Sequence, residues 1–160
     1  SRGARINESR TEDWINVNEC LDMALELTGL DATATVHKDS AELPPILGAR
    51  EELVTMFVNL LANAVDAMSD EPAVRIKSEV EGDSVAVTII DNGVGMDSAT
   101  RRSAFNMFYS TKKDARGIGL STVQLLAGRH HGQVLLNSVV GKGTAVRVLL
   151  PMNGAPAESA

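Results

Sequence analysis

Only one cysteine, Cys20, occurs among the 160 residues. A single thiol excludes an internal disulfide and a cysteine-rich zinc site, and it is typical of a reducing compartment. No run approaches the roughly 20 apolar residues of a membrane-spanning helix, so we expect no direct membrane contact from this segment. The first five residues contain neither a starting Met nor the apolar core of a signal peptide, which is typical of a processed product or of a piece of a longer protein.

Positive charge is also in short supply, because 15 Lys and Arg residues face 21 Asp and Glu residues, for a net charge of -6. A general nucleic-acid binder needs a basic face that neutralises phosphates. We therefore expect no nucleic-acid partner, although a local basic cluster can still hold a small anion. Hydrophobic residues make up 44% of the chain, and this share and length fit one domain with a sizeable core rather than two.

Apolar residues recur at helical spacing in three segments. The expected helices cover about residues 16–28, 49–69 and 117–131. Asn16 or Asn18 is the expected N-cap of the first helix, and Gly29 its expected end. Gly132 is expected to end the third helix.

Strand patterns fill most of the remaining chain. Alternation or short apolar runs predict strands at 34–37, 46–47, 74–80, 85–90, 134–139 and 144–150. Residues 93–116 lack a strong period, and a connection of this length is usually functional. Helices segregated from mostly antiparallel strands predict the α+β class: a two-layer α/β sandwich with a mixed, mostly antiparallel sheet covered on one face by about three helices.

Two asparagines on the second helix are candidate metal ligands. Asn59 and Asn63 are four residues apart, so their amides point the same way about one turn apart. Mg²⁺ prefers oxygen ligands and takes most of them from water and substrate phosphates. An isolated asparagine pair on a polar stripe is more often simply solvated, but the otherwise apolar character of this helix favours a function.

Asp91 ends a strand pattern and is followed by Gly93, Gly95 and Met96. Its carboxylate can accept a hydrogen bond from an exocyclic amine, and the glycines allow a ligand to approach the backbone closely. Met96 offers a polarizable surface to a flat ring. An ordinary Asp-Asn-Gly turn explains the same residues about equally well when they are taken alone.

Two later glycine clusters are weaker signals. Gly117-Ile118-Gly119-Leu120-Ser121 begins a helix, where unpaired N–H groups and the positive end of the dipole attract phosphate. Lys112, Lys113 and Arg116 add positive charge just before it. A glycine-rich helix start often serves packing alone. Gly141-Lys142-Gly143-Thr144, taken alone, fits a hairpin turn better than a ligand site.

In this order the motifs resemble the ATP-binding sandwich shared by sensor histidine kinases, DNA gyrase, mismatch-repair clamp ATPases and the ninety-kilodalton heat-shock chaperone. The strongest resemblance is to the catalytic and ATP-binding domain of two-component sensor histidine kinases, over roughly residues 16–151. The run 108–112 is similar to the nitrogen-regulation branch. The matching segments are the N box at 59–64, the first glycine box at 91–96, the F box at 105–108, and the second and third glycine boxes at 117–121 and 141–144.

The resemblance implies a role for each position. Asn63 would be the principal Mg²⁺ ligand, and Asn59 would assist it near the phosphates. Asp91 would take the adenine amine and Thr144 would support that contact. Residues 97–116 would form a long ATP lid. The other implied nucleotide-binding positions are Asp66, Gly93, Gly95, Met96, Phe105, Phe108, Lys112, Arg116, Gly117, Ile118, Gly119 and Leu120.

Departures from the family pattern bear on the reaction. Asp66 stands where the family often has a basic residue, and Ala115-Arg116 replaces a longer glycine-rich stretch. Hydrolysing relatives place a water-activating Glu at the position of Asn59, so the residues favour phosphoryl transfer, which needs mainly positioning and charge neutralisation. None of the three histidines, His37, His130 and His131, stands in the family's acceptor context.

The resemblance therefore implies the ATP-binding half of a protein histidine kinase, with ATP and Mg²⁺ as cofactors. Its expected partners are a histidine-bearing dimerisation domain, upstream or in trans, and a response regulator. Residues 1–15 would be a lead-in or the end of the preceding dimerisation segment, and residues 152–160 a flexible tail. The expected location is the cytoplasm, which includes the cytoplasmic part of a membrane-bound bacterial sensor.

Other functions stay open at this point. A degenerate regulatory module would bind nucleotide without moving a phosphate. A serine kinase of the anti-sigma type shares the same sandwich. A clamp-type ATPase fits least, given Asn59 and the short chain.

Overall fold

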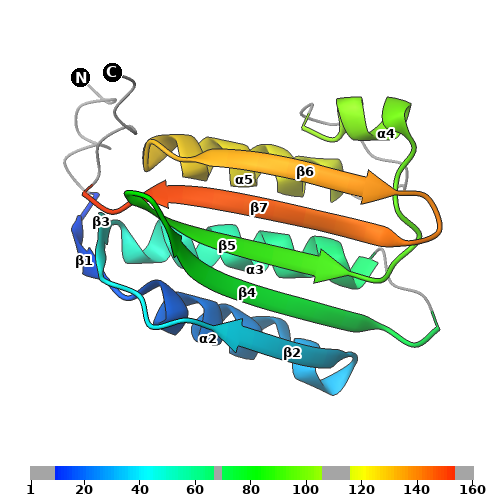
Figure 1. Cartoon of the computed structure of the whole chain (residues 1–160), viewed down its shortest axis with the longest axis horizontal. Coiled ribbons are helices and arrows are strands. Elements are labelled where there is room, and N and C mark those ends of the chain that lie inside the picture. The colour runs from blue at the N-terminus through cyan, green and yellow to red at the C-terminus, as the bar shows by residue number, and fades with distance from the viewer. Residues whose placement is uncertain (1–9, 67–69, 106–115, 154–160) are drawn as a thin grey trace.

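A five-stranded sheet with helices on one of its faces forms the body of the computed structural model (Figure 1). The structure describes residues 10–66, 70–105 and 116–153. The strand order is β2-β4-β5-β7-β6, in which only β2 and β4 pair in parallel. The strands are β2 (Thr35–Ser40), β4 (Ala73–Glu81), β5 (Ser84–Asp91), β6 (Gln133–Val139) and β7 (Gly143–Pro151). The predicted mixed, mostly antiparallel sheet is confirmed.

Three helices cover one face of this sheet: α2 (Val17–Thr28), α3 (Arg50–Asp66) and α5 (Arg116–Arg129). The ends of α2 follow the sequence signals. The Asn16 side chain accepts a hydrogen bond from the Glu19 N–H at 3.3 Å, and Gly29, in the left-handed region at φ 64, ends the helix. Helix α3 packs against both α2 and α5, so the apolar side of α3 occupies the middle of the core.

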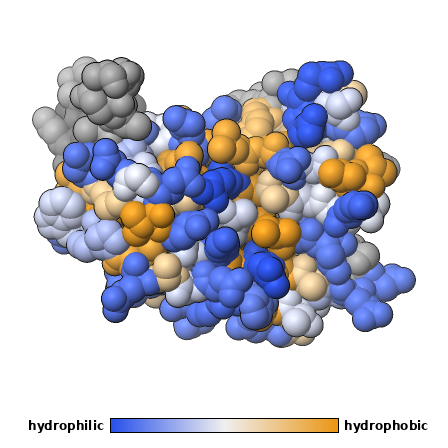
Figure 2. Space-filling model, viewed as in Figure 1, coloured by the Kyte–Doolittle hydropathy of each residue, from blue (hydrophilic) through white to orange (hydrophobic). Residues whose placement is uncertain are grey.

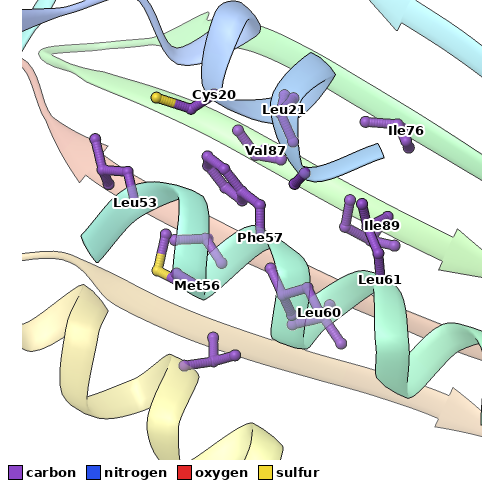
Figure 3. Packing of buried hydrophobic residues seen from close by; sticks show 14 of the residues in the cluster. Cys20, Leu21, Leu53, Met56, Phe57, Leu60, Leu61, Ile76, Val87 and Ile89 are labelled. Atoms are coloured by element: carbon purple, nitrogen blue, oxygen red, sulfur yellow. The ribbon is translucent and has the colours of Figure 1, made fainter. Parts of the chain in front are cut away.

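Figure 3 shows how the core is filled. Phe57 of α3 is fully buried and projects between α2 and the sheet, towards Leu21 and Val87. Cys20 lies in the same layer and has no exposed surface. Burial raises the pKa of the Cys20 thiol to about 11, so the thiol stays protonated at neutral pH and acts as a small apolar side chain.

The other face of the sheet is open to solvent and carries a mixture of charged and scattered apolar side chains (Figure 2). Arg147 of β7 donates to Glu79 at 3.2 Å and to the Thr88 hydroxyl at 3.1 Å, and it also pairs with Glu81. Exposed apolar residues such as Leu135 and Val139 lie on the β6 edge of this face. Among the described residues, no helix is both long and apolar enough to cross a membrane.

Four short elements complete the chain, and three of them were absent from the sequence prediction. The strand β1 (Asp13–Ile15) pairs antiparallel with β3 (Ile46–Gly48), the 3₁₀ turn η1 (Leu30–Ala32) follows α2, and the short helix α4 (Ser98–Ser103) lies after β5. Only β3 was predicted. Three-residue strands and single turns carry too few residues to show a period.

The expected lead-in and tail both join the fold in part. Strand β1 belongs to the segment 1–15 that was assigned as a lead-in, and pairing with β3 holds it in place. Met152, expected in a flexible tail, donates its N–H to the Asp83 carbonyl at 3.0 Å and accepts from the Leu47 N–H at 2.9 Å. Long-range backbone pairing holds the described residues Asp13–Ile15 and Met152, and local sequence does not reveal such pairing.

The end of α5 corrects the expectation for Gly132. His131, not the glycine, adopts the left-handed conformation, with φ 60. The Gly132 N–H donates to the Ala127 carbonyl at 2.7 Å, the 6→1 bond of a Schellman motif. A Cβ on Gly132 would lie 2.3 Å from the Leu149 carbonyl oxygen. The glycine is therefore needed for close packing of α5 against β7.

An ion-pair cluster joins the segment before β1 to the start of α3 and to the end of α5. Glu52 of α3 accepts two hydrogen bonds from the Arg129 guanidinium, at 2.9 and 3.0 Å, and one from Arg10 at 3.0 Å. Arg10 also donates to the Arg129 carbonyl at 3.3 Å. Burial alone would raise the pKa of Glu52, but the Arg129 and Arg10 hydrogen bonds lower it below its ordinary 4.5. This cluster anchors the incoming chain to α3 and α5.

His130 is buried beside this cluster, with 3% of its surface exposed. Its Nε2 accepts the Ala49 N–H at 3.1 Å, and its Nδ1 lies 2.9 Å from the Leu126 carbonyl. A carbonyl only accepts, so Nδ1 carries the proton and the ring is neutral. The role of His130 is structural, as expected from its sequence context.

We expect the free energy of unfolding to fall as pH drops below 6.5. Burial lowers the pKa of His130 below its ordinary 6.5; the Leu126 hydrogen bond and the Glu52 and Glu12 charges oppose this, while the Arg10 charge adds to it. Between the folded pKa and 6.5 the unfolded chain binds more protons, so folding loses stability there. Urea unfolding from pH 8 to 5.5 measures the slope.

NMR titration of the His130 ring gives the direct test. A ring that titrates at or above pH 6.5 contradicts the assignment.

Candidate functional site

Four of the sequence motifs converge at one end of the molecule, on the right of Figure 1. The last residue of β5 and the first residues of β7 are neighbours there, with Asp91 paired to Thr144 across the two strands. The C-terminal end of α3 and the N-terminal end of α5 lie at the same end. The ion-pair cluster lies at the opposite end of these two helices. The fold therefore brings the N box and the three glycine boxes together.

Asp91 is a buried acid, with 7% of its surface exposed. Its Oδ1 accepts the Gly93 N–H at 2.9 Å and the Thr144 N–H at 3.3 Å. Within the described part of the chain, Oδ2 accepts no hydrogen bond. Burial raises the pKa of the Asp91 carboxyl by more than the two backbone N–H groups lower it. The two N–H groups thus hold the Asp91 carboxylate in place through Oδ1, although burial disfavours its charged form. Oδ2 is left to bind a ligand.

The first and third glycine boxes fit into each other, backbone against backbone. A Cβ on Gly95 would lie 2.0 Å from the Val139 carbonyl oxygen, and a Cβ on Gly143 would lie 2.0 Å from the Asp91 carbonyl oxygen. Both glycines also have positive φ, 73 and 126. The Gly141 N–H donates to the Val94 carbonyl at 2.8 Å and ties the two loops together. The 141–144 segment is therefore a hairpin turn that also forms one wall of the site.

Asn59 and Asn63 present amide groups on α3. The Asn59 Nδ2 donates to the Thr55 carbonyl at 2.9 Å, so its Oδ1 is directed away from the helix backbone. The Asn63 Nδ2 is buried without a hydrogen-bond partner. Rotation of the amide by about 180° exchanges its oxygen and its NH₂ group. The Asn63 side chain can therefore present its oxygen to a cation or its NH₂ group to a phosphate. A buried polar group left unpaired is costly unless a ligand completes it.

The amide oxygens of Asn59 and Asn63 are of the ligand type that Mg²⁺ prefers. Among the described residues, no three His, Cys, Asp or Glu side chains gather to hold a metal. A site of neutral amide oxygens suits a Mg²⁺ ion that arrives with substrate phosphates and keeps several waters. The bound ion would supply charge neutralisation on those phosphates.

Helix α5 begins at Arg116, so the second glycine box forms its first turn. The first N–H groups of a helix have no partner within the helix, and they favour an anion together with the dipole. Leu120, at the end of this box, is buried with 8% exposed. Arg116 was assigned to the lid, and the structure places it in the helix instead.

The lid segment is described in part. Asp97 caps α4 by accepting the Thr100 N–H at 2.7 Å. Phe105 and Met96 are half-buried and pack against the core. Phe108 and Lys112 lie outside the described residues, as do the side chains of Asp66, Arg116 and Ile118.

Sequence reasoning missed one polar residue of this end. Ser138 of β6 is 7% exposed, and its hydroxyl accepts the Met96 N–H at 2.8 Å. A serine facing inward on a strand that ends at a glycine turn was the available signal. The pairing of β6 with β7, predicted as a hairpin, brings Ser138 to this end of the sheet, but its contact with Met96, 42 residues away, cannot be read from local sequence.

Comparison with known proteins matches residues 48–154, more than half of the chain, to the family described as histidine kinase-, DNA gyrase B-, and HSP90-like ATPase. The chain belongs to this family. The matched region of this ATPase-family domain starts at the end of β3 and contains all of the motifs named above.

Curated relatives of the domain include sensor kinases. It is 36% identical over 113 residues to the signal transduction histidine-protein kinase AtoS of Escherichia coli K12, covering 70% of this chain and 19% of AtoS. It is 30% identical over 145 residues to the sensor histidine kinase ZraS of Klebsiella oxytoca, covering 88% of this chain and 31% of ZraS. The domain thus spans about a fifth to a third of these relatives.

Solved structures share the fold. The mycobacterial sensor histidine kinase MprB superposes with a TM-score of 0.79 at 19% identity, covering 89% of this chain and 99% of that one. The catalytic domain of the histidine kinase ThkA gives 0.79 at 20% identity, covering 91% and 97%. The two-layer α+β architecture of this ATPase-family domain is therefore that of histidine kinase catalytic domains.

Proposed function

We propose that this domain binds ATP with Mg²⁺ and positions the γ-phosphate for transfer to a histidine on a separate dimerisation domain, within two-component signal transduction. The observation that carries the proposal is the held Asp91 carboxylate, whose Oδ2 faces no partner in the described chain while Oδ1 is fixed by two N–H groups. Such an oxygen can accept a hydrogen bond from the adenine amine. Gly95 and Met96 would border the base, and Gly93 would allow its close approach.

The phosphates are assigned to the other half of the site. Asn63 would be the principal Mg²⁺ ligand with Asn59 beside it, and backbone N–H groups of 117–120 would hold the phosphate chain. Lys112 and Arg116 remain candidates for the terminal phosphate, and Asp66, Phe105 and Phe108 for the lid and its surroundings. The remaining nucleotide-binding positions in this proposal are Ile118, Leu120 and Thr144.

Transfer is favoured over hydrolysis by the nature of Asn59. Its amide donates to the Thr55 carbonyl, and an amide cannot take a proton from water. Without a base at this position, the domain would mainly position the nucleotide and neutralise charge, which phosphoryl transfer requires. His130 is buried and bonded at both ring nitrogens, so it is unsuited to be the acceptor.

The decisive experiment supplies a histidine-bearing dimerisation domain to this chain together with labelled ATP and Mg²⁺. We expect acid-labile label on the supplied domain and essentially none on this chain. A response regulator added afterwards should remove the label. Nucleotide binding without any transfer would favour the regulatory module, and acid-stable label on a protein serine would favour the serine kinase.

Asn63→Ala should weaken Mg²⁺-dependent ATP binding about tenfold, because the variant loses a metal ligand. The difference from wild type should vanish in excess chelator. Since the Asn63 Nδ2 is buried and unpaired, the free energy of unfolding should not fall. Calorimetric titration in both buffers measures the effect, and Asn137→Ala on the exposed face of β6 is the control. Equal weakening with and without Mg²⁺ would contradict the metal assignment.

A further inference from the structure

Ser138 links three parts of the site through one hydroxyl group. Its Oγ lies 2.8 Å from the Met96 N–H, 3.0 Å from the Gly143 carbonyl oxygen and 2.7 Å from the Thr144 Oγ1. These partners belong to the first glycine box, the hairpin turn and the start of β7.

The direction of each hydrogen bond follows from the chemistry of the groups. A hydroxyl has one proton to donate and two lone pairs to accept with. The Met96 N–H only donates and the Gly143 carbonyl only accepts, so the Ser138 proton goes to Gly143. The bond between the two hydroxyls must then be donated by Thr144, because the Ser138 proton is already used.

This arrangement fixes what Thr144 offers to a ligand. With its proton committed to Ser138, the Thr144 Oγ1 presents only lone pairs. The adjacent Asp91 carboxylate likewise only accepts. The wall formed by these two side chains therefore accepts hydrogen bonds and offers no side-chain donor, which suits an amino group and disfavours a carbonyl group at the same place.

We propose that Ser138 is a specificity-determining positioning residue, which orients the Thr144 hydroxyl as an acceptor and holds the Met96 backbone at the base. The inference rests on the proposed function, since it assumes that Asp91 and Thr144 face the adenine amine. Ser138 acts through Thr144 and Met96 and is not assigned a contact with the nucleotide.

The test compares ATP with inosine triphosphate, which carries a carbonyl where adenine carries the amine. In Ser138→Ala, the Thr144 proton is released and can turn towards a ligand carbonyl. We expect the affinity for ATP to fall about tenfold and the preference for ATP over inosine triphosphate to narrow by a similar factor. Binding of Mg²⁺-tripolyphosphate, which lacks a base, should be unchanged.

Ser78→Ala is the matched control. Ser78 is a serine of β4, 2% exposed, whose hydroxyl donates to the Asn18 side chain at 2.8 Å. This variant loses a buried hydroxyl on the same sheet, and the partner that it gives up is Asn18, outside the glycine boxes. Thermal unfolding measures the loss of stability in both variants. We expect only Ser138→Ala to change the preference for ATP over inosine triphosphate.

A double-mutant cycle with Thr144→Val separates positioning from general damage. If Ser138 acts through the Thr144 hydroxyl, Ser138→Ala should cause no further narrowing of the nucleotide preference in the Thr144→Val background. An unchanged preference in the single variant Ser138→Ala, whatever its stability, overturns the inference. Failure of the wild-type domain to bind ATP would instead overturn the proposed function, so the two failures are distinguishable.

Discussion

Asp91→Asn is expected to weaken ATP binding about 10- to 100-fold and to leave the domain folded. Oδ1 accepts from the Gly93 and Thr144 N–H groups, so an Asn side chain must keep its oxygen at that position. Its NH₂ group then takes the place of Oδ2. A donor would face the donor of the adenine amine, and the contact would turn from favourable to repulsive.

The stability of this variant separates a binding role from a structural one. Burial raises the pKa of Asp91 by more than its two N–H partners lower it. The charged form is therefore disfavoured in the folded state. Removing the charge should therefore leave the free energy of unfolding at neutral pH unchanged or raised. If the charged carboxylate instead stabilised the fold, Asp91→Asn would lower the free energy of unfolding.

Fluorescent nucleotide titration and urea unfolding measure the two quantities. Asp97→Asn is the control, because it makes the same chemical change six residues later and Asn caps a helix as well as Asp does. Inosine triphosphate should lose less affinity than ATP in Asp91→Asn, since its carbonyl can accept from the new NH₂ group. Equal affinity of wild type and Asp91→Asn for ATP would refute the adenine assignment.

Gly95→Ala should abolish measurable nucleotide binding and lower the free energy of unfolding by about 3 kcal/mol or more. The new methyl group would lie 2.0 Å from the Val139 carbonyl oxygen, which is backbone and cannot move aside alone. The two loops must separate, and the Gly141 to Val94 hydrogen bond would be lost with them. Positive φ adds a further penalty of about 1 kcal/mol.

Gly82→Ala isolates the conformational part of this effect. Gly82 has a similar positive φ of 61, but nothing lies within 4 Å of the position of its Cβ. The control should lose only about 1 kcal/mol and bind nucleotide normally. Similar losses in Gly82→Ala and Gly95→Ala, by chemical unfolding, would show that the contact between the glycine boxes is unimportant.

Local signals predicted the regular elements of the fold well. The helical period, the candidate N-caps Asn16 and Asn18, and Gly29 placed α2 to within about two residues, and the alternation on either side of Gly82 placed the β4–β5 hairpin. What local signals could not give was pairing between distant segments. The β1–β3 pair joins residues more than 30 positions apart, and its strands are too short to carry a period.

The same distinction between local signals and distant pairing applies to the candidate site. The Asp91 turn and the third glycine box each read as an ordinary turn when taken alone, and only their order suggested ATP. Their contact depends on the β5–β7 register, which sets Thr144 opposite Asp91. Ser138 escaped notice because an inward serine is common in sheets, and its three partners are separated from it by up to 42 residues.

The buried, protonated Cys20 makes this chain convenient for spectroscopy. It is the only thiol in the sequence, and burial keeps it from reacting with thiol reagents. A cysteine introduced at Val94, in the first glycine box, or at Val140, next to the third, each 64% exposed, would therefore take up a maleimide dye while Cys20 stays in place. Dyes at these two positions would follow the separation of the loops directly, in solution and in real time.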